Sequence, residues 1–290
     1  MLFDEEYLKR LQKLKLDLSR ILKSGFQGQH RSSMAGSGME FNDFRAYIPG
    51  DDYRYIDWNL YSRLGRLFIK LFQEEKEFLF YLLIDQSQSM SFGQPSKIQV
   101  ALKLAGALGY IGLSNYDRIG ASLFNTGLDE TFKPGRGQDK IHAYLQFLEN
   151  NMNTAGETDL NRVLDYLSYQ YKKPGTVIIL SDFLDEKGYQ RGLRSLADKD
   201  WNIFIIQVLT PEEIDPQIEG DIRIVDIETE KKTNINIDQD ALSSYRKKVD
   251  NFRNELQSFA LHYDIKYIFY KTDIDFEDLI LKLIKNKLII

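Results

Sequence analysis

Three oxygen-bearing side chains at every second position follow an apolar run in this chain of 290 residues. Asp85, Ser87 and Ser89 come directly after residues 78–84, which read FLFYLLI. An uninterrupted apolar run of this length is typical of a strand buried in a parallel sheet. A carboxylate and two hydroxyls are ligands of the kind that Mg²⁺ takes in proteins. The motif therefore indicates a cation site at a strand end, although Asp and Ser are also ordinary helix-cap and turn residues.

Two further residues extend this set. Asp182 ends a second apolar run, 177–181, and Thr158 lies at a predicted helix start in the segment GETDL, residues 156–160. Ligands of open α/β sheets bind at the carboxyl ends of the strands, where the strand order reverses, so we expect the five side chains to meet there. Two carboxylates and three hydroxyls predict Mg²⁺, with Mn²⁺ as an alternative, and leave a position that an incoming carboxylate would complete. Two strands that each end in Asp favour this interpretation over helix capping.

The elements that must position these residues follow from hydrophobic periodicity, which predicts an α/β domain with a mostly parallel sheet flanked by helices. Strands are predicted at 78–85, 118–125, 128–133, 176–182, 202–209 and 265–271, and helices at 97–115, 138–151, 159–171, 187–199, 239–262 and 275–288. A small hairpin is predicted within 222–237. Ser96 and Gln99 have the spacing of a capping box, which predicts a helix start after the Asp85 loop. The order is therefore strand, loop and helix, with Asp85 at the end of the strand.

The N-terminal region has a different character. Leucines and isoleucines from Leu8 to Leu22 recur at helical spacing among Lys and Arg, which predicts an amphipathic helix that ends before Gly25 and packs on the chain's own domain. Residues 25–38 are rich in Gly, Ser and Gln and predict an irregular, mobile loop. We therefore expect two regions: a helix with an irregular extension over 1–75, packed on a main domain over 76–290.

Composition excludes several classes of protein. The chain has no cysteine, which excludes disulfides, thiolate nucleophiles and cysteine-based zinc or iron–sulfur sites. No apolar stretch approaches the roughly 20 residues of a membrane span, and the start lacks a signal-peptide pattern, so we expect a cytoplasmic protein without an integral membrane segment. Residues 9–70 carry a surplus of six positive charges although the whole chain has a formal charge of −5. Association of this region with anionic membranes or nucleic acid is the weakest alternative, and we expect no nucleic-acid partner.

Asp85, Ser87, Ser89, Thr158 and Asp182 together resemble the metal-ion-dependent adhesion site of the von Willebrand factor A fold. Upstream, residues 38–58, which read GMEFNDFRAYIPGDDYRYIDW, are similar to the signature of a bacterial family, domain of unknown function 58, whose members carry an A-like domain. Residues 68–70, 156–160 and 181–183 continue the resemblance, which covers about residues 20–275.

The resemblance implies a von Willebrand factor A-like, Rossmann-type sheet in which strands 78–85 and 176–182 are neighbours and the strand near 128–133 is antiparallel at the edge. It also implies binding rather than turnover, because members of the family are commonly linked with MoxR-type AAA+ ATPases as adaptors or clients in chaperone-like systems. We therefore expect a non-enzymatic, metal-dependent protein-binding module whose partner presents an acidic side chain.

The segment Gly50–Trp58 allows three interpretations. Local structure would explain it if Asp51 or Asp52 caps the following residues and Arg54 pairs with Asp57. Alternatively, the segment is a partner-binding surface beside the metal edge, with Gly50, Asp51, Asp52, Arg54, Asp57 and Trp58 as its residues. Thirdly, its three carboxylates would join Asp85 and Asp182 in a Mg²⁺- or Mn²⁺-dependent phosphohydrolase or nuclease, which is the enzyme alternative.

Overall fold

The computed structural model describes residues 2–25, 40–73, 79–171, 174–218, 220–225 and 232–285. The chain divides into two compact units: a main unit of Met1–Leu18 with Phe78–Ile290, and a small unit of Ser19–Glu77. The first 18 residues thus belong with the main unit, whereas the sequence placed them with the extension. The predicted packing of the extension on the main domain stays a prediction.

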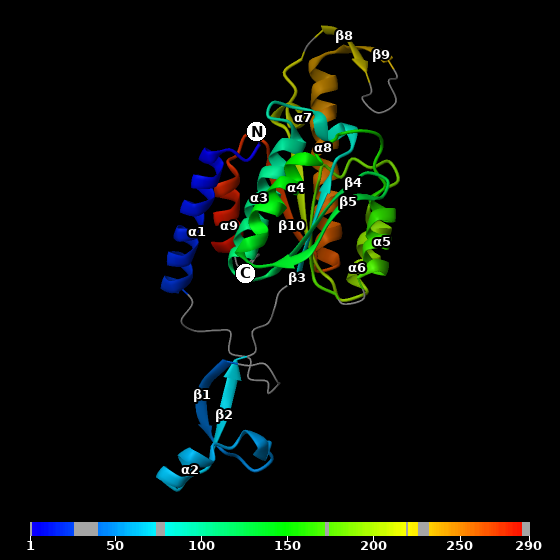
Figure 1. Cartoon of the computed structure of the whole chain (residues 1–290). Coiled ribbons are helices and arrows are strands. Elements are labelled where there is room, and N and C mark those ends of the chain that lie inside the picture. The colour runs from blue at the N-terminus through cyan, green and yellow to red at the C-terminus, as the bar shows by residue number, and fades with distance from the viewer. Residues whose placement is uncertain are drawn as a thin grey trace. The chain divides into compact units, whose positions relative to one another are not determined.

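The main unit is built on a six-stranded sheet in the order β10-β7-β6-β3-β4-β5 (Figure 1). Its strands are β3 (Leu79–Asp85), β4 (Arg118–Phe124), β5 (Leu128–Arg136), β6 (Thr176–Ser181), β7 (Asn202–Leu209) and β10 (Lys266–Lys271). Five strands run parallel, and β5 pairs antiparallel with β4 at one edge. All six predicted strands are confirmed. The antiparallel edge strand and the neighbouring β3 and β6 are the features that the resemblance to the von Willebrand factor A fold implies.

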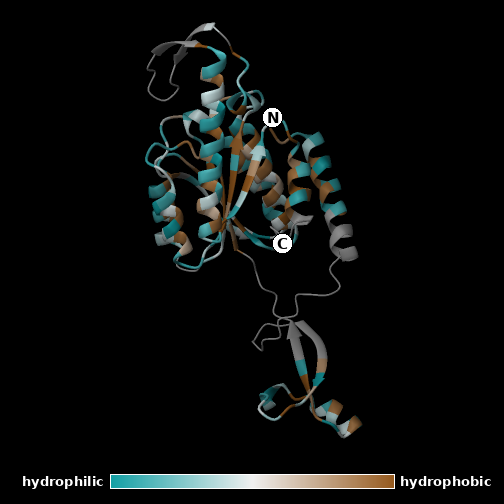
Figure 2. Cartoon of the chain, turned by 180° about the vertical axis from the view of Figure 1, so that it is seen from behind, coloured by the Kyte–Doolittle hydropathy of each residue, from teal (hydrophilic) through white to brown (hydrophobic). Residues whose placement is uncertain are grey.

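Helices cover both faces of this sheet, and its strands form the apolar centre of the unit (Figure 2). One core cluster joins the sheet to α1 (Glu5–Gly25), α3 (Lys97–Ser114), α4 (Ile141–Asn150) and α9 (Phe276–Lys285). A second cluster joins the other face to α5 (Leu160–Gln170), α6 (Gln190–Ala197) and α8 (Gln239–His262). Two-sided burial explains the continuous apolar runs of the central strands. The predicted fold class is confirmed.

The N-terminal helix α1 packs on the main unit through the apolar stripe that its sequence predicts. Tyr7, Leu11 and Leu14 are buried in the core cluster that contains α3 and α9. On its polar side, Arg10 forms ion pairs with Asp275 and with Glu277 at the start of α9. Packing on the chain's own domain is thus confirmed for this helix. The predicted loop at 25–38 lies almost wholly outside the described residues.

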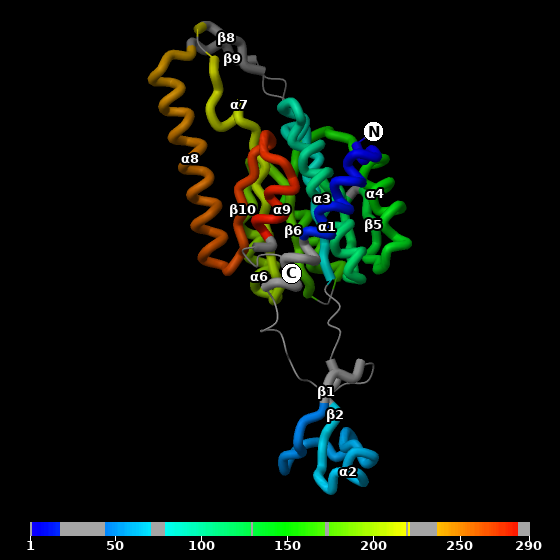
Figure 3. Tube along the Cα trace, turned by 90° about the vertical axis from the view of Figure 1, so that its left-hand side faces the viewer, coloured from blue at the N-terminus to red at the C-terminus, as the bar shows by residue number. Residues whose placement is uncertain are grey.

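Between β7 and β10 the chain leaves the sheet and returns through a long helix. The short helix α7 (Pro211–Ile214) leads to the antiparallel pair β8 (Gly220–Val225) and β9 (Lys232–Ile237), which confirms the predicted hairpin. Helix α8 then runs back from the hairpin to the sheet (Figure 3). Within the described parts of the chain, no helix is long and apolar enough to cross a membrane.

The small unit has more regular structure than the predicted irregular extension. It contains the antiparallel strands β1 (Glu40–Ala46) and β2 (Phe68–Gln73), joined through the 3-10 turn η1 (Tyr53–Tyr55) and helix α2 (Trp58–Leu64). A bulge between Phe41 and Asp43 shifts the register of β1. Because a bulge interrupts the two-residue alternation that marks a strand, the sequence pattern concealed this strand.

Candidate metal centre

Two neighbouring strands bring the predicted carboxylates to one edge of the sheet. Strand β3 ends at Asp85, and Asp182 directly follows β6, which pairs parallel with β3. The strand order reverses here, since β4 and β5 continue on one side and β7 and β10 on the other. Such a reversal is where open α/β sheets place their ligands. The predicted neighbourhood of Asp85 and Asp182 is confirmed, and their role as metal ligands stays a prediction.

Asp85 is completely buried, and both of its carboxylate oxygens accept hydrogen bonds. The backbone N–H of Ser87 donates to Oδ1 over 2.9 Å, and the Ser181 hydroxyl donates to Oδ2 over 2.6 Å. Burial and the nearby charge of Asp182 raise the pKa of Asp85 to about 7, although the hydrogen bonds from Ser181 and Ser87 act against this rise. This carboxylate is therefore oriented for a ligand at the sheet edge and is costly to keep charged without a cation.

Asp182 is 1% exposed and carries the densest contacts of the site. Its Oδ1 accepts from the Leu184 backbone N–H at 3.0 Å, and its Oδ2 accepts from the Ser89 hydroxyl at 2.8 Å and the Lys97 ammonium at 2.7 Å. The next residue, Phe183, has a left-handed φ of 62°, which costs an L residue about 1–2 kcal/mol. The Ser181 hydroxyl accepts from the Phe183 N–H and holds this turn.

The hydroxyls of the set are only partly assembled. Ser87 Oγ and Ser89 Oγ lie 3.1 Å apart, in and beside the 3-10 turn η2 (Gln88–Ser91). Thr158 is buried, and its hydroxyl donates to the backbone carbonyl of Asn125 at 3.4 Å. Its loop lies beside the Asp85 loop, because the Gln88 N–H donates to the Gly156 carbonyl. Four of the five predicted residues thus share one hydrogen-bonded cluster, and Thr158 belongs to the adjoining loop.

Lys97 and Glu213 complete the site and were missed from the sequence. The Lys97 side chain is fully buried, and its ammonium contacts both Asp182 and Glu213. Burial works against its charged form, but these two carboxylates outweigh burial and raise the pKa of Lys97. The sequence held one signal: Lys97 is the first residue of α3, where the helix dipole disfavours a cation. A lysine there requires a carboxylate partner from elsewhere in the fold.

The cluster fits Mg²⁺ or Mn²⁺ by ligand type, because it offers carboxylate and hydroxyl oxygens, which these hard cations prefer. Hydrogen bonds hold the Ser87, Ser89 and Asp182 oxygens 3.1 and 2.8 Å apart. In the described residues, no group of three or more His, Cys, Asp or Glu side chains is placed to hold a metal ion. A site here would therefore depend on its serine hydroxyls as well as on its two carboxylates.

In the small unit, each carboxylate of the signature segment has its own structural partner. Asp51 accepts from the Arg45 guanidinium and from the Ile48 N–H, and Asp52 pairs with Arg54. The hydrogen bonds from Arg45 and Arg54 hold the pKa values of Asp51 and Asp52 below their usual range.

Asp57 serves a different role, as the cap of helix α2. It accepts from the Leu60 N–H and pairs with Lys70, so the predicted Arg54–Asp57 pair is wrong. Together with the separate partners of Asp51 and Asp52, this geometry gives the three carboxylates no common ion. Hydrolysis through the Asp cluster stays a prediction that this geometry does not favour.

The same segment also exposes large apolar side chains. Trp58 is 61% exposed and stacks edge to face on Tyr61, and Tyr53 is 72% exposed. Gly50 has a φ of 108°, which an L side chain rarely adopts, and so allows the turn that precedes Asp51. The predicted partner-binding residues thus include an exposed aromatic group. Their position beside the metal edge stays a prediction.

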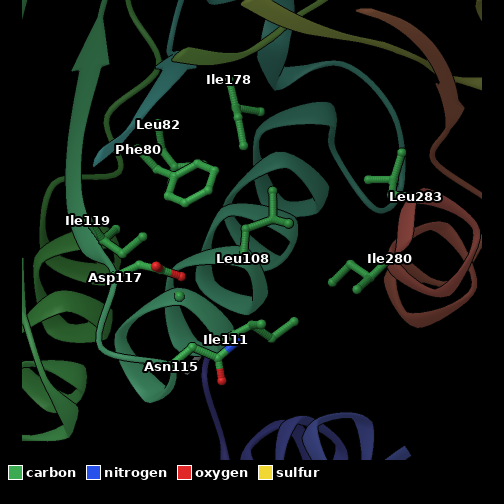
Figure 4. A pocket seen from close by; sticks show the side chains of 11 residues that line it. Phe80, Leu82, Leu108, Ile111, Asn115, Asp117, Ile119, Ile178, Ile280 and Leu283 are labelled. Atoms are coloured by element: carbon green, nitrogen blue, oxygen red, sulfur yellow. The ribbon is translucent and has the colours of Figure 1, made fainter. Parts of the chain in front are cut away.

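The main unit also contains an apolar pocket, which lies away from the cluster of Asp85 and Asp182 (Figure 4). It is lined mainly by Phe80, Leu82, Leu108, Ile178, Ile280 and Leu283. Phe80 lies at the beginning of β3, at the opposite end of the strand from Asp85. The pocket offers few polar groups, so the chemistry of the site stays with the carboxylate cluster.

Comparisons with known proteins place the chain in a family. It is 28% identical over 231 residues to uncharacterized proteins of Mycobacterium bovis and Mycobacterium tuberculosis, which covers 78% of this chain and 72% of each relative. Among solved structures, it is similar to the conserved hypothetical protein BatB from Bacteroides thetaiotaomicron, with 14% identity, a TM-score of 0.44 and coverage of 73% and 98% of the two chains.

A second similar structure is an aerotolerance-related membrane protein from Bacteroides fragilis, with 16% identity, a TM-score of 0.45 and the same coverage of 73% and 98%. The manganese-loaded TRAP protein of Plasmodium vivax gives 21% identity, a TM-score of 0.36 and coverage of 45% and 57%. The family described as "Protein of unknown function DUF58" matches residues 43–255, which is most of the chain and includes parts of both units. The chain therefore belongs to the DUF58 family.

Proposed function

We propose that this chain is a protein-binding module that captures an acidic side chain of a partner through a divalent cation. Asp85, Ser87, Ser89, Thr158 and Asp182 would hold Mg²⁺ or Mn²⁺. The observation that carries the proposal is the hydrogen-bonded cluster at the ends of β3 and β6, where Ser89 Oγ lies 2.8 Å from Asp182 Oδ2. The cation would supply an exchangeable position that a partner carboxylate completes.

The chain's own residues support such a site by orienting its oxygens. The Ser87 N–H and the Ser181 hydroxyl hold the two oxygens of Asp85, and the Leu184 N–H holds Asp182 Oδ1. The serine hydroxyls can rotate, so that each turns its lone pairs toward a cation. Rigid supports around adaptable hydroxyls suit reversible binding, and we propose binding rather than turnover.

The proposed partner is a MoxR-type AAA+ ATPase, or a protein handled by one, in a chaperone-like complex. This choice rests on the family resemblance and on the need for a partner carboxylate. Because such an ATPase works on cytoplasmic ATP, we place the chain in the cytoplasm. The exposed Trp58, with Arg54 and the rest of the segment Gly50–Trp58, would form a second contact, since exposed aromatic and arginine side chains are common anchors of interfaces.

Calorimetry tests the metal-dependent part directly. The chain is titrated with Mg²⁺ and with Mn²⁺, and then with a purified MoxR-type ATPase in the presence of either ion or of a chelator. We expect Asp85→Asn to abolish ion binding and metal-dependent capture. Asp198→Asn is the matched control, because Asp198 is exposed at the end of α6. Full partner affinity in chelator, or in Asp85→Asn, would contradict the proposal.

The second contact has its own test. Trp58→Ala is expected to weaken partner binding about tenfold or more, as truncation of a central aromatic anchor does. Tyr169→Ala is the control, because Tyr169 on α5 is 84% exposed and lies outside the segment. Equal affinities of the two variants would remove Trp58 from the interface without affecting the metal-dependent part.

A further inference from the structure

The candidate metal centre already contains a cation of the chain's own. The Lys97 ammonium lies 2.7 Å from Asp182 Oδ2 and also contacts Glu213 Oε1. Its side chain is 0% exposed, and Asp182 is 1% exposed. A buried ammonium at the first turn of a helix loses its hydration and is disfavoured by the helix dipole. The two carboxylates therefore stabilise its charged form.

Lys97 contacts the Asp182 oxygen that also faces the proposed ligand Ser89. Asp182 Oδ2 accepts from Lys97 and from Ser89, and Ser89 belongs to the proposed ligand set. Two cations on one buried oxygen would repel each other strongly at this distance. Lys97 therefore has to release Asp182 when that oxygen is used for a divalent cation.

Glu213 is placed to retain the ammonium after that release. Its Oε2 accepts from the Thr210 N–H in the capping box of α7, while its Oε1 faces Lys97. The Glu213 side chain is 17% exposed. Its two oxygens join the capping box of α7 to the site. Lys97 can lose one carboxylate without becoming an unpaired buried charge.

We propose that Lys97 competes with the divalent cation for Asp182, and that Glu213 takes over the ammonium when the cation binds. This inference rests on the proposed function. It makes Lys97 and Glu213 positioning residues with opposite effects on metal affinity. It also links site occupancy to α7, and from there to α8, because Tyr245 donates to the Glu213 carbonyl and Arg246 pairs with Asp215.

Metal affinities of charge variants test the competition. By calorimetry with Mg²⁺ or Mn²⁺ alone, Lys97→Met should bind about tenfold more tightly or better, because the competing charge is gone. Glu213→Gln should bind about tenfold more weakly, because Lys97 then has Asp182 as its remaining carboxylate partner. The double variant should bind like Lys97→Met, because Glu213 acts on the site through Lys97. If Lys97→Met does not fold, the direction in which Glu213→Gln changes the metal affinity still tests the competition.

The controls separate local competition from general charge. Lys103→Met removes the same charge from the same helix α3, and Glu212→Gln removes the exposed neighbour of Glu213. Both should stay within about twofold of the parent, since Lys103 is half-buried, Glu212 is exposed, and solvent screens charges that it reaches. Equal affinities of Lys97→Met, Glu213→Gln and the parent would overturn the inference and leave the metal site intact. The proposed function would be overturned as well if the parent bound no ion, or if Asp85→Asn bound the ion as tightly as the parent.

Hydrogen exchange tests the link to α7. Addition of Mg²⁺ should change the protection of amides in α7 and at the start of α8 in the parent. The same addition to Glu213→Gln, at a concentration that saturates it, should leave these amides unchanged. An equal response in both proteins would refute transmission through Glu213, even if the affinities shift as expected.

Discussion

In the small unit, Asp51 and Asp52 are partly exposed and each pairs with an arginine, and Asp57 caps a helix and pairs with Lys70, whereas Asp85 and Asp182 of the main unit are buried together. Their surroundings shift pKa values in opposite directions. Hydrogen bonds from Arg45 and Arg54 lower those of Asp51 and Asp52, and burial raises that of Asp85. Aspartates thus stabilise local turns in the small unit, whereas in the main unit burial disfavours the charged form of Asp85. Perturbation by burial beside a like charge, at a strand end, marks the functional candidate.

The largest difference should appear when one acid is removed from each unit. Asp182→Ala leaves Lys97 buried with one carboxylate partner fewer, so we expect a loss of about 3–5 kcal/mol in the free energy of unfolding. Urea denaturation in chelator measures it. Asp52→Ala removes an exposed ion pair with Arg54 and should leave the urea midpoint of the main unit unchanged. Similar losses in both variants would remove the contrast between the units.

Core packing in the main unit gives the next effect. Gly109 lies on α3 against Tyr144 of α4, and an added Cβ would lie 2.2 Å from the tyrosine ring. Gly109→Ala should therefore cost about 1–3 kcal/mol through overpacking, measured by urea denaturation. Gly127→Ala is the matched control, because nothing lies within 4 Å of that position. A neutral Gly109→Ala would mean that α3 and α4 adjust freely.

The small unit should respond to backbone conformation instead. Gly65 ends helix α2 with a φ of 64°, and no atom lies within 4 Å of an added Cβ. Gly65→Ala should cost about 1 kcal/mol through strain alone, seen as faster hydrogen exchange of α2 amides. Gly65→Asn should cost less, because asparagine tolerates this conformation better. If the α2 amides of Gly65→Ala and Gly65→Asn exchange at the same rate, backbone strain is not the cause.

The smallest effect concerns pH in the small unit. Because the folded-state pKa values of Asp51 and Asp52 are lowered, their stabilisation is complete above the unfolded value of about 3.9 and is lost as the pH falls through the folded values. Carboxyl NMR titration should give midpoints below about 3.9 for both residues. Asp51→Asn should remove the acid dependence of the Ile48 amide, which donates to Asp51. Midpoints at or above the ordinary value would contradict the ion pairs.

Sequence patterns predicted those parts of the fold in which local pattern and global packing agree. Apolar runs and the Ser96–Gln99 capping box located the six strands of the main sheet, helix α3 and the strand ends that hold Asp85 and Asp182. The bulge in β1 hid a strand because it breaks the alternation.

The remainder of the site could not be predicted for a different reason. The contacts of Lys97 with Asp182 and Glu213 join residues 85 and 116 positions apart, and no local pattern encodes such pairs. Only the unfavourable place of a lysine at a helix start pointed toward them.

The hydrogen bond from Ser181 to Asp85 spans 96 residues of chain, and this separation has a consequence for biogenesis. At typical translation rates, the ribosome needs on the order of 5–20 s between the synthesis of the two residues. During that interval Asp85 and Lys97 exist without β6, which supplies Ser181 and leads into Asp182. A truncated or stalled chain that ends before β6 therefore lacks Ser181 and Asp182, and with them half of this edge. A partner that recognises the edge thus selects chains whose central sheet is finished.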